Sequence, residues 1–324
     1  MACLGLCMAS RNLEMSHIVV MHDTRRLLWL RRKQHAFRDK HRDSRVPVLS
    51  ASSLTVESFP SSISEGKKLI DELREIRSLL AWGVRRLRYS WECSKRESTA
   101  LWPESLREMT FGPNFNHPDI DIIWPGSLEA LEFGRDFDQP LYGVVWPTTL
   151  KRFEFGTYFD QAIEDVRWPD SLEYLAFGEQ FNSRVKIVVW PSLLKGLSFR
   201  ETFNQKIEKV EWPASIQRVS FGENFNQKTH KVVWPASLER LTFGSAYNQS
   251  LAGVEWPASL HSLTFGTKFN WLIAELVWPD TLEMVWFGDS FDQPIDNVVW
   301  PAALKHLTFR SNFNQPIEAV AWPP

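Results

Sequence analysis

Cysteine is scarce in this 324-residue chain, and its three copies, Cys3, Cys7 and Cys93, all precede residue 100. The larger C-terminal part therefore has neither a disulfide framework nor a cysteine cluster that could hold a zinc ion. We expect a reducing, cytoplasmic environment, with the nucleus as the alternative, and no cofactor.

Long apolar runs are also missing. No stretch approaches the roughly 18 apolar residues that a membrane-spanning helix needs. The apolar start MACLGLCMAS has no basic segment before it and is soon interrupted by Arg11 and Glu14. The sequence therefore predicts a soluble protein without a membrane span.

Charge is nearly balanced overall, with a formal net charge of −2, but it is divided unevenly. Residues 1–100 carry 19 Lys and Arg against 11 Asp and Glu, whereas residues 101–324 carry 18 against 28. The two parts of the chain are thus electrostatically different.

Tryptophan and phenylalanine are abundant, with 16 and 22 copies, and most of them belong to one repeat. A Trp-Pro pair recurs every 22 residues without an insertion or deletion, which gives ten complete units over residues 102–321. Numbered from its Trp, each unit follows W-P-x-S-L-x-x-L-x-F-G-x-x-F-N-Q-x-I-x-x-V-x. Position 10 is Phe in all ten units, and position 15 is always Asn or Asp.

Positions 5 to 10 of each unit predict a short strand, as in Leu238, Leu241 and Phe243, with positions 7 and 9 directed outward. The frequent Gly at position 11 permits close approach of the backbone, and the Asn or Asp at position 15 predicts a side-chain ladder. The Pro ends an extended segment at a corner that the Trp fills. Because one unit cannot bury its apolar face alone, the units are predicted to stack into a solenoid with a parallel sheet.

The strings FGDSFDQPI at residues 287–295 and FRSNFNQPI at residues 309–317 resemble the FNIP repeat, a 22-residue relative of the leucine-rich repeat. The resemblance covers about two thirds of the chain. It departs from the family pattern in the Trp before each Pro and in the sparse Pro at position 17. It implies a mainly β, right-handed, leucine-rich-repeat-like solenoid used for protein interaction, often beside an F-box in other proteins, and it implies no catalytic residues.

Three domains are expected. Residues 102–324 form the ten-repeat FNIP-like solenoid, and residues 62–101 form a capping helix and a degenerate capping repeat. The helix is predicted at about residues 64–81 from helical spacing of apolar residues at Leu69, Leu73, Ile76 and Leu80. Residues 1–61 form a basic, partly disordered arm and linker.

Both ends of the chain leave alternatives open. Residues 25–45 hold nine Lys and Arg, which is compatible with a nucleic-acid or anionic-surface contact. Because no RNA- or DNA-binding fold pattern accompanies these charges, a solvated flexible arm is favoured. No F-box pattern is present in residues 1–80, which weakens the adaptor function implied by the family. The chain stops at Trp322-Pro323-Pro324, where either the prolines blunt the sheet edge or the edge packs against a partner or a second copy.

Catalysis needs unlike polar residues to converge, and the repeat offers no such place. The four histidines of the array occupy four different unit positions: His117, His230, His261 and His306. The array contains no cysteine nucleophile and no Gly-rich phosphate loop after a strand. We therefore expect no enzyme activity and no metal site.

The outward strand positions are better candidates for binding. Position 9 is mostly small or hydroxylic, but unit 9 has Trp286 there, with Met284 on the same strand and His306 beside it. This pattern favours an interface anchor, unless Trp286 only lies flat over its small neighbours. Position 7 adds a group that suits an acidic partner, unless it is merely scattered surface charge: Arg152, Tyr174, Arg218 and Arg240.

The sequence as a whole predicts a non-catalytic protein–protein interaction scaffold. One alternative is a substrate adaptor of a ubiquitin-ligase type complex, and another is nucleic-acid or anionic-surface binding through the basic arm. A third is a structural protein that self-associates through its C-terminal edge.

Overall fold

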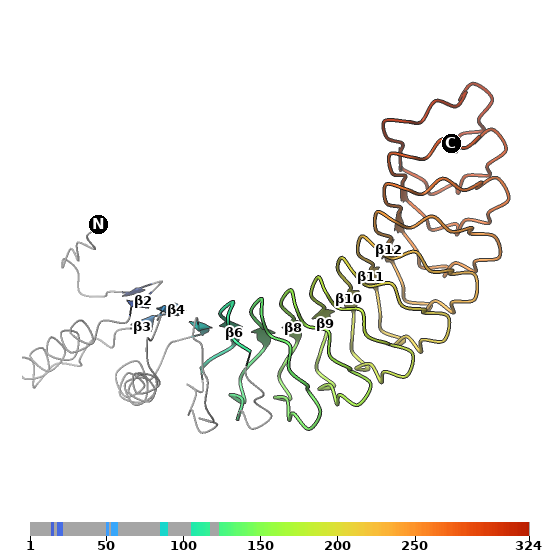
Figure 1. Cartoon of the computed structure of the whole chain (residues 1–324). Helices are drawn as coiled ribbons and strands as arrows, with labels where there is room; N and C mark the ends of the chain where they lie inside the picture. Colours follow the sequence, from blue (N-terminus) through green and yellow to red (C-terminus); the bar gives the residue numbers. More distant parts are fainter. Residues whose placement is uncertain are drawn as a thin grey trace, which may run out of the picture.

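The computed structural model describes residues 105–116 and 123–323, together with short segments before them at residues 14–15, 18–21, 50–51, 53–57 and 85–89. Each unit of the array contributes one strand to a single parallel sheet. The strands are β6 (Glu108–Phe111), β7 (Ala130–Glu132), β8 (Arg152–Glu154), β9 (Tyr174–Ala176), β10 (Gly196–Ser198), β11 (Arg218–Ser220), β12 (Arg240–Thr242), β13 (Ser262–Thr264), β14 (Met284–Trp286) and β15 (His306–Thr308). The units form an arc with the strands on its concave side (Figure 1). The predicted leucine-rich-repeat-like solenoid with a parallel sheet is therefore confirmed.

The sheet continues beyond the ten units toward the N-terminus. Strands β5 (Arg86–Tyr89), β4 (Ser53–Glu57) and β2 (Ile18–Met21) extend it to 13 strands, and β1 (Glu14–Met15) pairs separately with β3 (Ser50–Ala51). Strand β5 pairs with β6 at the same 22-residue offset as the units of the array. The helix predicted at residues 64–81 and the basic stretch at residues 25–45 lie outside the described residues.

Each of units 2 to 10 is closed by three tight turns, at positions 2–5, 11–14 and 18–21. In unit 7 these turns are held by hydrogen bonds from Leu238 N to Pro235 O at 3.1 Å, from Tyr247 N to Gly244 O at 3.2 Å, and from Val254 N to Leu251 O at 3.0 Å. The strand lies between the first two turns. The third turn is therefore at the convex edge of the solenoid, opposite the sheet.

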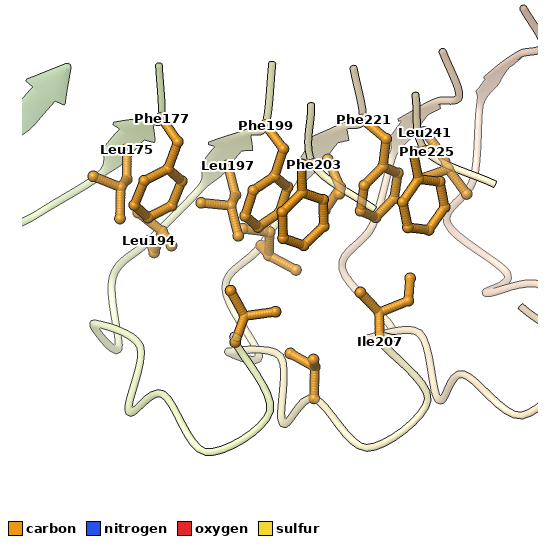
Figure 2. Packing of buried hydrophobic residues seen from close by; sticks show 14 of the residues in the cluster. Leu175, Phe177, Leu194, Leu197, Phe199, Phe203, Ile207, Phe221, Phe225 and Leu241 are labelled. Atoms are coloured by element: carbon orange, nitrogen blue, oxygen red, sulfur yellow. The ribbon is translucent and has the colours of Figure 1, made fainter. Parts of the chain in front are cut away.

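Phenylalanine columns fill the interior, as the inward assignment of position 10 predicts. Within unit 5 the rings of Phe199 and Phe203 stack with centroids 3.9 Å apart, and Phe203 lies 6.2 Å from Phe225 in the next unit. Leucine and isoleucine side chains pack below these rings (Figure 2). The position-10 Phe is buried from unit 1 to unit 9 and becomes partly exposed only at Phe309. One continuous apolar core thus joins all units.

The Trp of each Trp-Pro pair fills a corner of this core. Trp212 and Trp234 stack with ring centroids 5.9 Å apart, and most of these indoles are less than one-tenth exposed. From Trp124 to Trp300 the nine indole N–H groups are buried and have no acceptor within the described part of the chain. These side chains therefore stabilise the wall through apolar burial and stacking rather than through hydrogen bonds.

Two polar ladders connect consecutive units. At position 15, Asn226 Oδ1 accepts hydrogen bonds from Asn248 N at 2.9 Å and from Gln249 Nε2 at 3.0 Å. At position 4, Ser237 Oγ donates to Ile216 O of the preceding unit at 2.7 Å. The first ladder confirms the role predicted for position 15.

In the described segments no helix has the length and apolar character needed to cross a membrane.

Candidate interaction surface

The concave face of the sheet is built from unit positions 7 and 9, which flank a buried middle residue. In β8, for example, Phe153 is fully buried while Arg152 is exposed and Glu154 is half-buried. Within the described ranges, no three His, Cys, Asp or Glu side chains are grouped so that they could hold a metal ion.

The structure brings Met284, Trp286 and His306 together on β14 and β15. Trp286 is 42% exposed and lies in register with Thr264 and Thr308 of the neighbouring strands. Met284 pairs in register with His306, which is exposed. Part of the indole is therefore accessible to a partner, and the rest packs beside its small neighbours. We refer to these three residues as the aromatic patch.

The four remaining candidates separate into two pairs of different character. The ring of Tyr174 lies over Gly196, because a Cβ on that glycine would come within 2.7 Å of Tyr174 Cδ1. The guanidinium of Arg152 is 5.9 Å from the centre of the same ring, and its Nε is 3.3 Å from Glu154 Oε1. Arg152 and Tyr174 are therefore engaged within the sheet.

Arg218 and Arg240 are different. They are direct in-register neighbours on β11 and β12, and both are exposed. Neither forms an ion pair or a side-chain hydrogen bond within the part of the chain that the structure describes. Two like charges on adjacent strands repel each other, and hydroxyl groups of Ser220 and Thr242 follow them on the same face. The arginine pair therefore presents two exposed positive charges that no described side chain neutralises.

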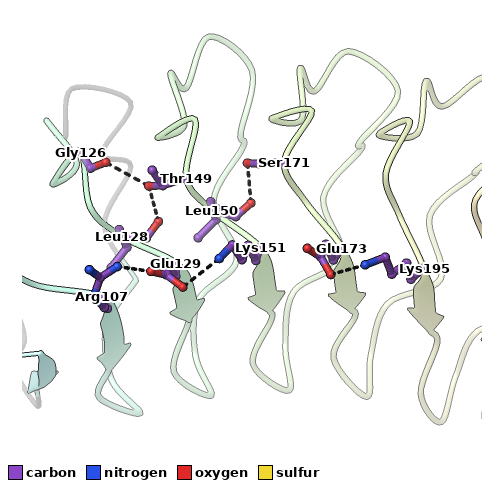
Figure 3. Close-up of polar contacts among 10 residues, drawn as sticks. All are labelled: Arg107, Gly126, Leu128, Glu129, Thr149, Leu150, Lys151, Ser171, Glu173 and Lys195. Carbon is purple, nitrogen blue, oxygen red and sulfur yellow. Dashed lines mark hydrogen bonds and ion pairs between the residues drawn. The ribbon is translucent and has the colours of Figure 1, made fainter.

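A ladder of ion pairs runs beside the sheet at unit position 6. Arg107 and Lys151 both bind Glu129, and Lys195 Nζ binds Glu173 Oε2 at 2.8 Å (Figure 3). Lys151, followed by Arg107, holds the pKa of Glu129 below its ordinary value despite some opposing desolvation. Opposite charges thus stabilise the stacking of units 1 to 5. Because these ion pairs are exposed, each contributes only a small stabilising free energy.

The ladder is interrupted at Gln217, in the unit that carries Arg218, and resumes where Lys305 Nζ binds Glu283 Oε1 at 2.7 Å. Lys305 is also the main reason that the pKa of Glu283 is lowered. The interruption covers the units of β11 to β13. The interruption coincides with the arginine pair. In this central stretch, therefore, neither the position-6 side chains nor the two arginines form ion pairs within the described residues.

Trp271, which replaces the usual Gln at position 16, is 43% exposed. Its Nε1 donates to Asn248 O at 2.9 Å, which substitutes for the Gln contact in the ladder. Sequence reasoning missed Gly196, whose lack of a side chain makes room for Tyr174. A glycine at an outward strand position, found in unit 5 alone, was the available signal.

Comparison with known proteins agrees with this architecture. Residues 203–246 and 291–324 match the FNIP Repeat family, so the array contains FNIP repeats as the sequence predicts. The fold is similar to the crystal structure of CroV588, described as a circular LRR protein, with a TM-score of 0.69 and 34% sequence identity. The similarity covers 85% of this chain but 39% of that one, so this chain spans about two fifths of the length of the circular protein. No curated protein matches the sequence.

Proposed function

We propose that this chain is a non-catalytic scaffold that binds a partner protein on the concave face of its sheet. FNIP repeats and leucine-rich-repeat-like solenoids are typically interaction scaffolds, which supports this assignment. The observation that carries the proposal is the exposed indole of Trp286 between Thr264 and Thr308, in a column of mostly small residues. Tryptophan is the side chain most often found at the energetic centre of protein interfaces.

The arginine pair supplies the second contact. Strand β13 alone separates β12 from β14, so Arg240 and Met284 are two strands apart, or roughly 10 Å. A partner segment that runs along the solenoid axis can place an apolar side chain on the aromatic patch and an anionic group on the arginine pair. Because the sheet is already ordered, little conformational entropy is lost from the scaffold on binding.

The experiment is a quantitative capture of lysate proteins by the full chain, compared with the double variant Met284→Ser/Trp286→Ser. We expect the wild type to capture a defined protein that the double variant loses. Circular dichroism and thermal melting of both proteins establish first that the variant retains the fold.

A matched control removes a comparable apolar area from another face. Val277 and Val299 precede their Trp residues, are 86% and 80% exposed, and lie outside the sheet. Val277→Ser/Val299→Ser should capture the same protein as the wild type. Equal capture by both double variants and the wild type would exclude the aromatic patch as the binding site.

A further inference from the structure

A second charged surface lies on the opposite side of the molecule from the sheet. At unit positions 17 to 20, three consecutive turns each present two exposed cationic side chains: Arg184, Lys186, Lys206, Lys209, Lys228 and Lys231. The first members of these pairs, Arg184, Lys206 and Lys228, are 22 residues apart in the sequence, so the solenoid stacks them. They lie in or beside the turns at positions 18–21, which begin at residues such as Ile207 on the side of the unit away from its strand (Figure 2). We call these six residues the convex basic corner.

The convex basic corner is confined to units 4 to 6. No other unit has a Lys or Arg at positions 17 to 20, and several have acidic residues there, such as Glu164 and Asp165 in unit 3 and Glu275 in unit 8. The array as a whole is acidic. A local concentration of six cations within it is therefore a distinct feature and not a consequence of general composition.

The six cations do not serve the fold. None forms an ion pair or side-chain hydrogen bond with another residue that the structure describes, and Glu208 is the single acidic residue at positions 17 to 20 of these three turns. At position 6 the same chain stacks opposite charges, as in Arg107 and Glu129, and so stabilises its own stacking. At position 17 it stacks like charges, Arg184, Lys206 and Lys228, which repel one another. The repulsion between these solvent-exposed charges is weak, and a bound anionic group would offset it.

We propose that the convex basic corner binds an acidic, extended segment of a partner protein that runs along the solenoid axis. The rings of Phe181, Phe203 and Phe225, three residues before the position-17 cations, stack with centroids 6.1 and 6.2 Å apart, and the units are at least this far apart on the side away from the sheet. Two residues of an extended chain span about 6.6 to 6.8 Å, and alternate side chains point the same way. A segment with carboxylates at alternate positions therefore sets one carboxylate against each turn.

Other occupants fit less well. Single-stranded nucleic acid is usually held by several aromatic side chains beside the cations. The exposed apolar neighbours of this corner are aliphatic, Ile187, Val189 and Val233, and His230 is the one exposed ring at positions 17 to 20 of these units. The chain's own basic stretch at residues 25–45 has the wrong sign of charge. The proposal is independent of the concave face, so the two surfaces can be tested separately.

The test measures binding of the full chain to a fluorescent peptide in which glutamate alternates with serine, by fluorescence anisotropy at low salt. The triple variant Arg184→Glu/Lys206→Glu/Lys228→Glu should bind about tenfold more weakly than the wild type or worse. The matched control, Arg200→Glu/Lys268→Glu/Arg310→Glu, reverses three exposed cations at unit positions 11 and 13, outside both proposed surfaces, and should bind within about twofold of the wild type. A glutamine–serine peptide should not bind.

Three outcomes would overturn the proposal. Unchanged binding by the triple variant would place the acidic peptide elsewhere, on the basic arm or the arginine pair. Tighter binding of a single-stranded oligonucleotide, lost in the same variant, would make the corner a nucleic-acid site. Concentration-dependent dimerisation that the variant abolishes would make a second copy the occupant. The neutral variant Arg184→Gln/Lys206→Gln/Lys228→Gln replaces the charge reversal if the latter fails to fold.

Discussion

Two departures from the repeat, at single residues, compensate each other inside the core. Position 14 is Phe in every unit except at Tyr247, and position 18 is aliphatic in units 2 to 10 except at Thr229. Both side chains are fully buried, and their hydroxyl oxygens are 2.8 Å apart. Burial raises the pKa of Tyr247, so the phenol stays neutral and the pair shares a hydrogen bond. A polar group placed alone at either position would lack a partner.

This pairing predicts non-additive effects on stability. Tyr247→Phe should cost about 1 kcal/mol of unfolding free energy, because it leaves the Thr229 hydroxyl buried without a partner. Thr229→Val should likewise leave the Tyr247 hydroxyl buried without a hydrogen-bond partner. The double variant restores the repeat pattern and should be destabilised by about 1 kcal/mol less than the sum of the two. Urea unfolding of the four proteins measures this coupling, and simple additivity would show that the hydrogen bond has no net effect.

The glycine at position 11 is required by close contact between turns. A Cβ on Gly244 would come within 1.7 Å of Gly222 O, whereas a Cβ on Gly126 would meet no atom within 4 Å. Gly244→Ala should therefore lower the unfolding free energy by about 1 to 3 kcal/mol, and the control Gly126→Ala should leave it nearly unchanged. Urea midpoints measure both. Arg200 and Arg310 occupy the same position in two units, and nothing in the structure explains how those turns admit a side chain. Equal midpoints for the two alanine variants would indicate that such adaptation is general.

At the scale of the elements, the position-15 ladder joins consecutive units by hydrogen bonds outside the sheet. Its Asn and Asp side chains have the same shape but differ in charge. Asp292 accepts hydrogen bonds from Asn314 N at 2.8 Å and Gln315 Nε2 at 2.9 Å, much as Asn226 does in unit 6. The bond from Asn314 N, and then that from Gln315, lowers the pKa of Asp292. A carboxylate whose pKa is lowered by folding contributes stability above its ordinary pKa and loses it as the pH falls.

This ladder predicts how acid affects the protein. Asp292→Asn keeps the acceptor oxygen and removes the titrating group, so its stability should fall less than that of the wild type between about pH 6 and pH 3. The reverse change, Asn226→Asp, should make the protein more sensitive to acid. Thermal melting across this pH range measures both variants. Parallel pH profiles for all three proteins would mean that the pKa of the ladder carboxylate is the same in the folded and the unfolded chain.

The elements themselves could be predicted from the sequence because a fixed 22-residue period makes each position report its own environment. An invariant Phe at position 10 and an Asn or Asp at position 15 identify the core and the ladder without any coordinates. Contacts made by departures from the repeat could not be predicted in the same way. The engagement of Arg152 by Tyr174, and the isolation of Arg218, depend on side-chain geometry across neighbouring strands. The convex basic corner needed only a comparison of charge at matching unit positions.

At the scale of the whole molecule, the arc follows from unequal spacing. Hydrogen-bonded strands are about 4.8 Å apart, whereas the nearly parallel position-14 rings of Phe203 and Phe225 are 6.2 Å apart. The units therefore fan out away from the sheet, which places the sheet on the concave side (Figure 1). Each unit contacts only its neighbours, so stability is a sum over units and the interfaces between them.

This arrangement predicts that the same substitution has different consequences in the middle and near the end of the array. Phe221, in unit 6, is 2% exposed, whereas Phe309 occupies the same position in unit 10 and is only partly buried. Phe221→Ala should cost roughly 3 to 5 kcal/mol and Phe309→Ala clearly less, because the second removes less buried area. Amide hydrogen exchange, read alongside urea unfolding, should show Phe221→Ala weakening protection on both sides of unit 6. For Phe309→Ala the loss should be confined to the last units. Equal and uniform loss of protection in both variants would mean that the solenoid unfolds as one cooperative body rather than unit by unit.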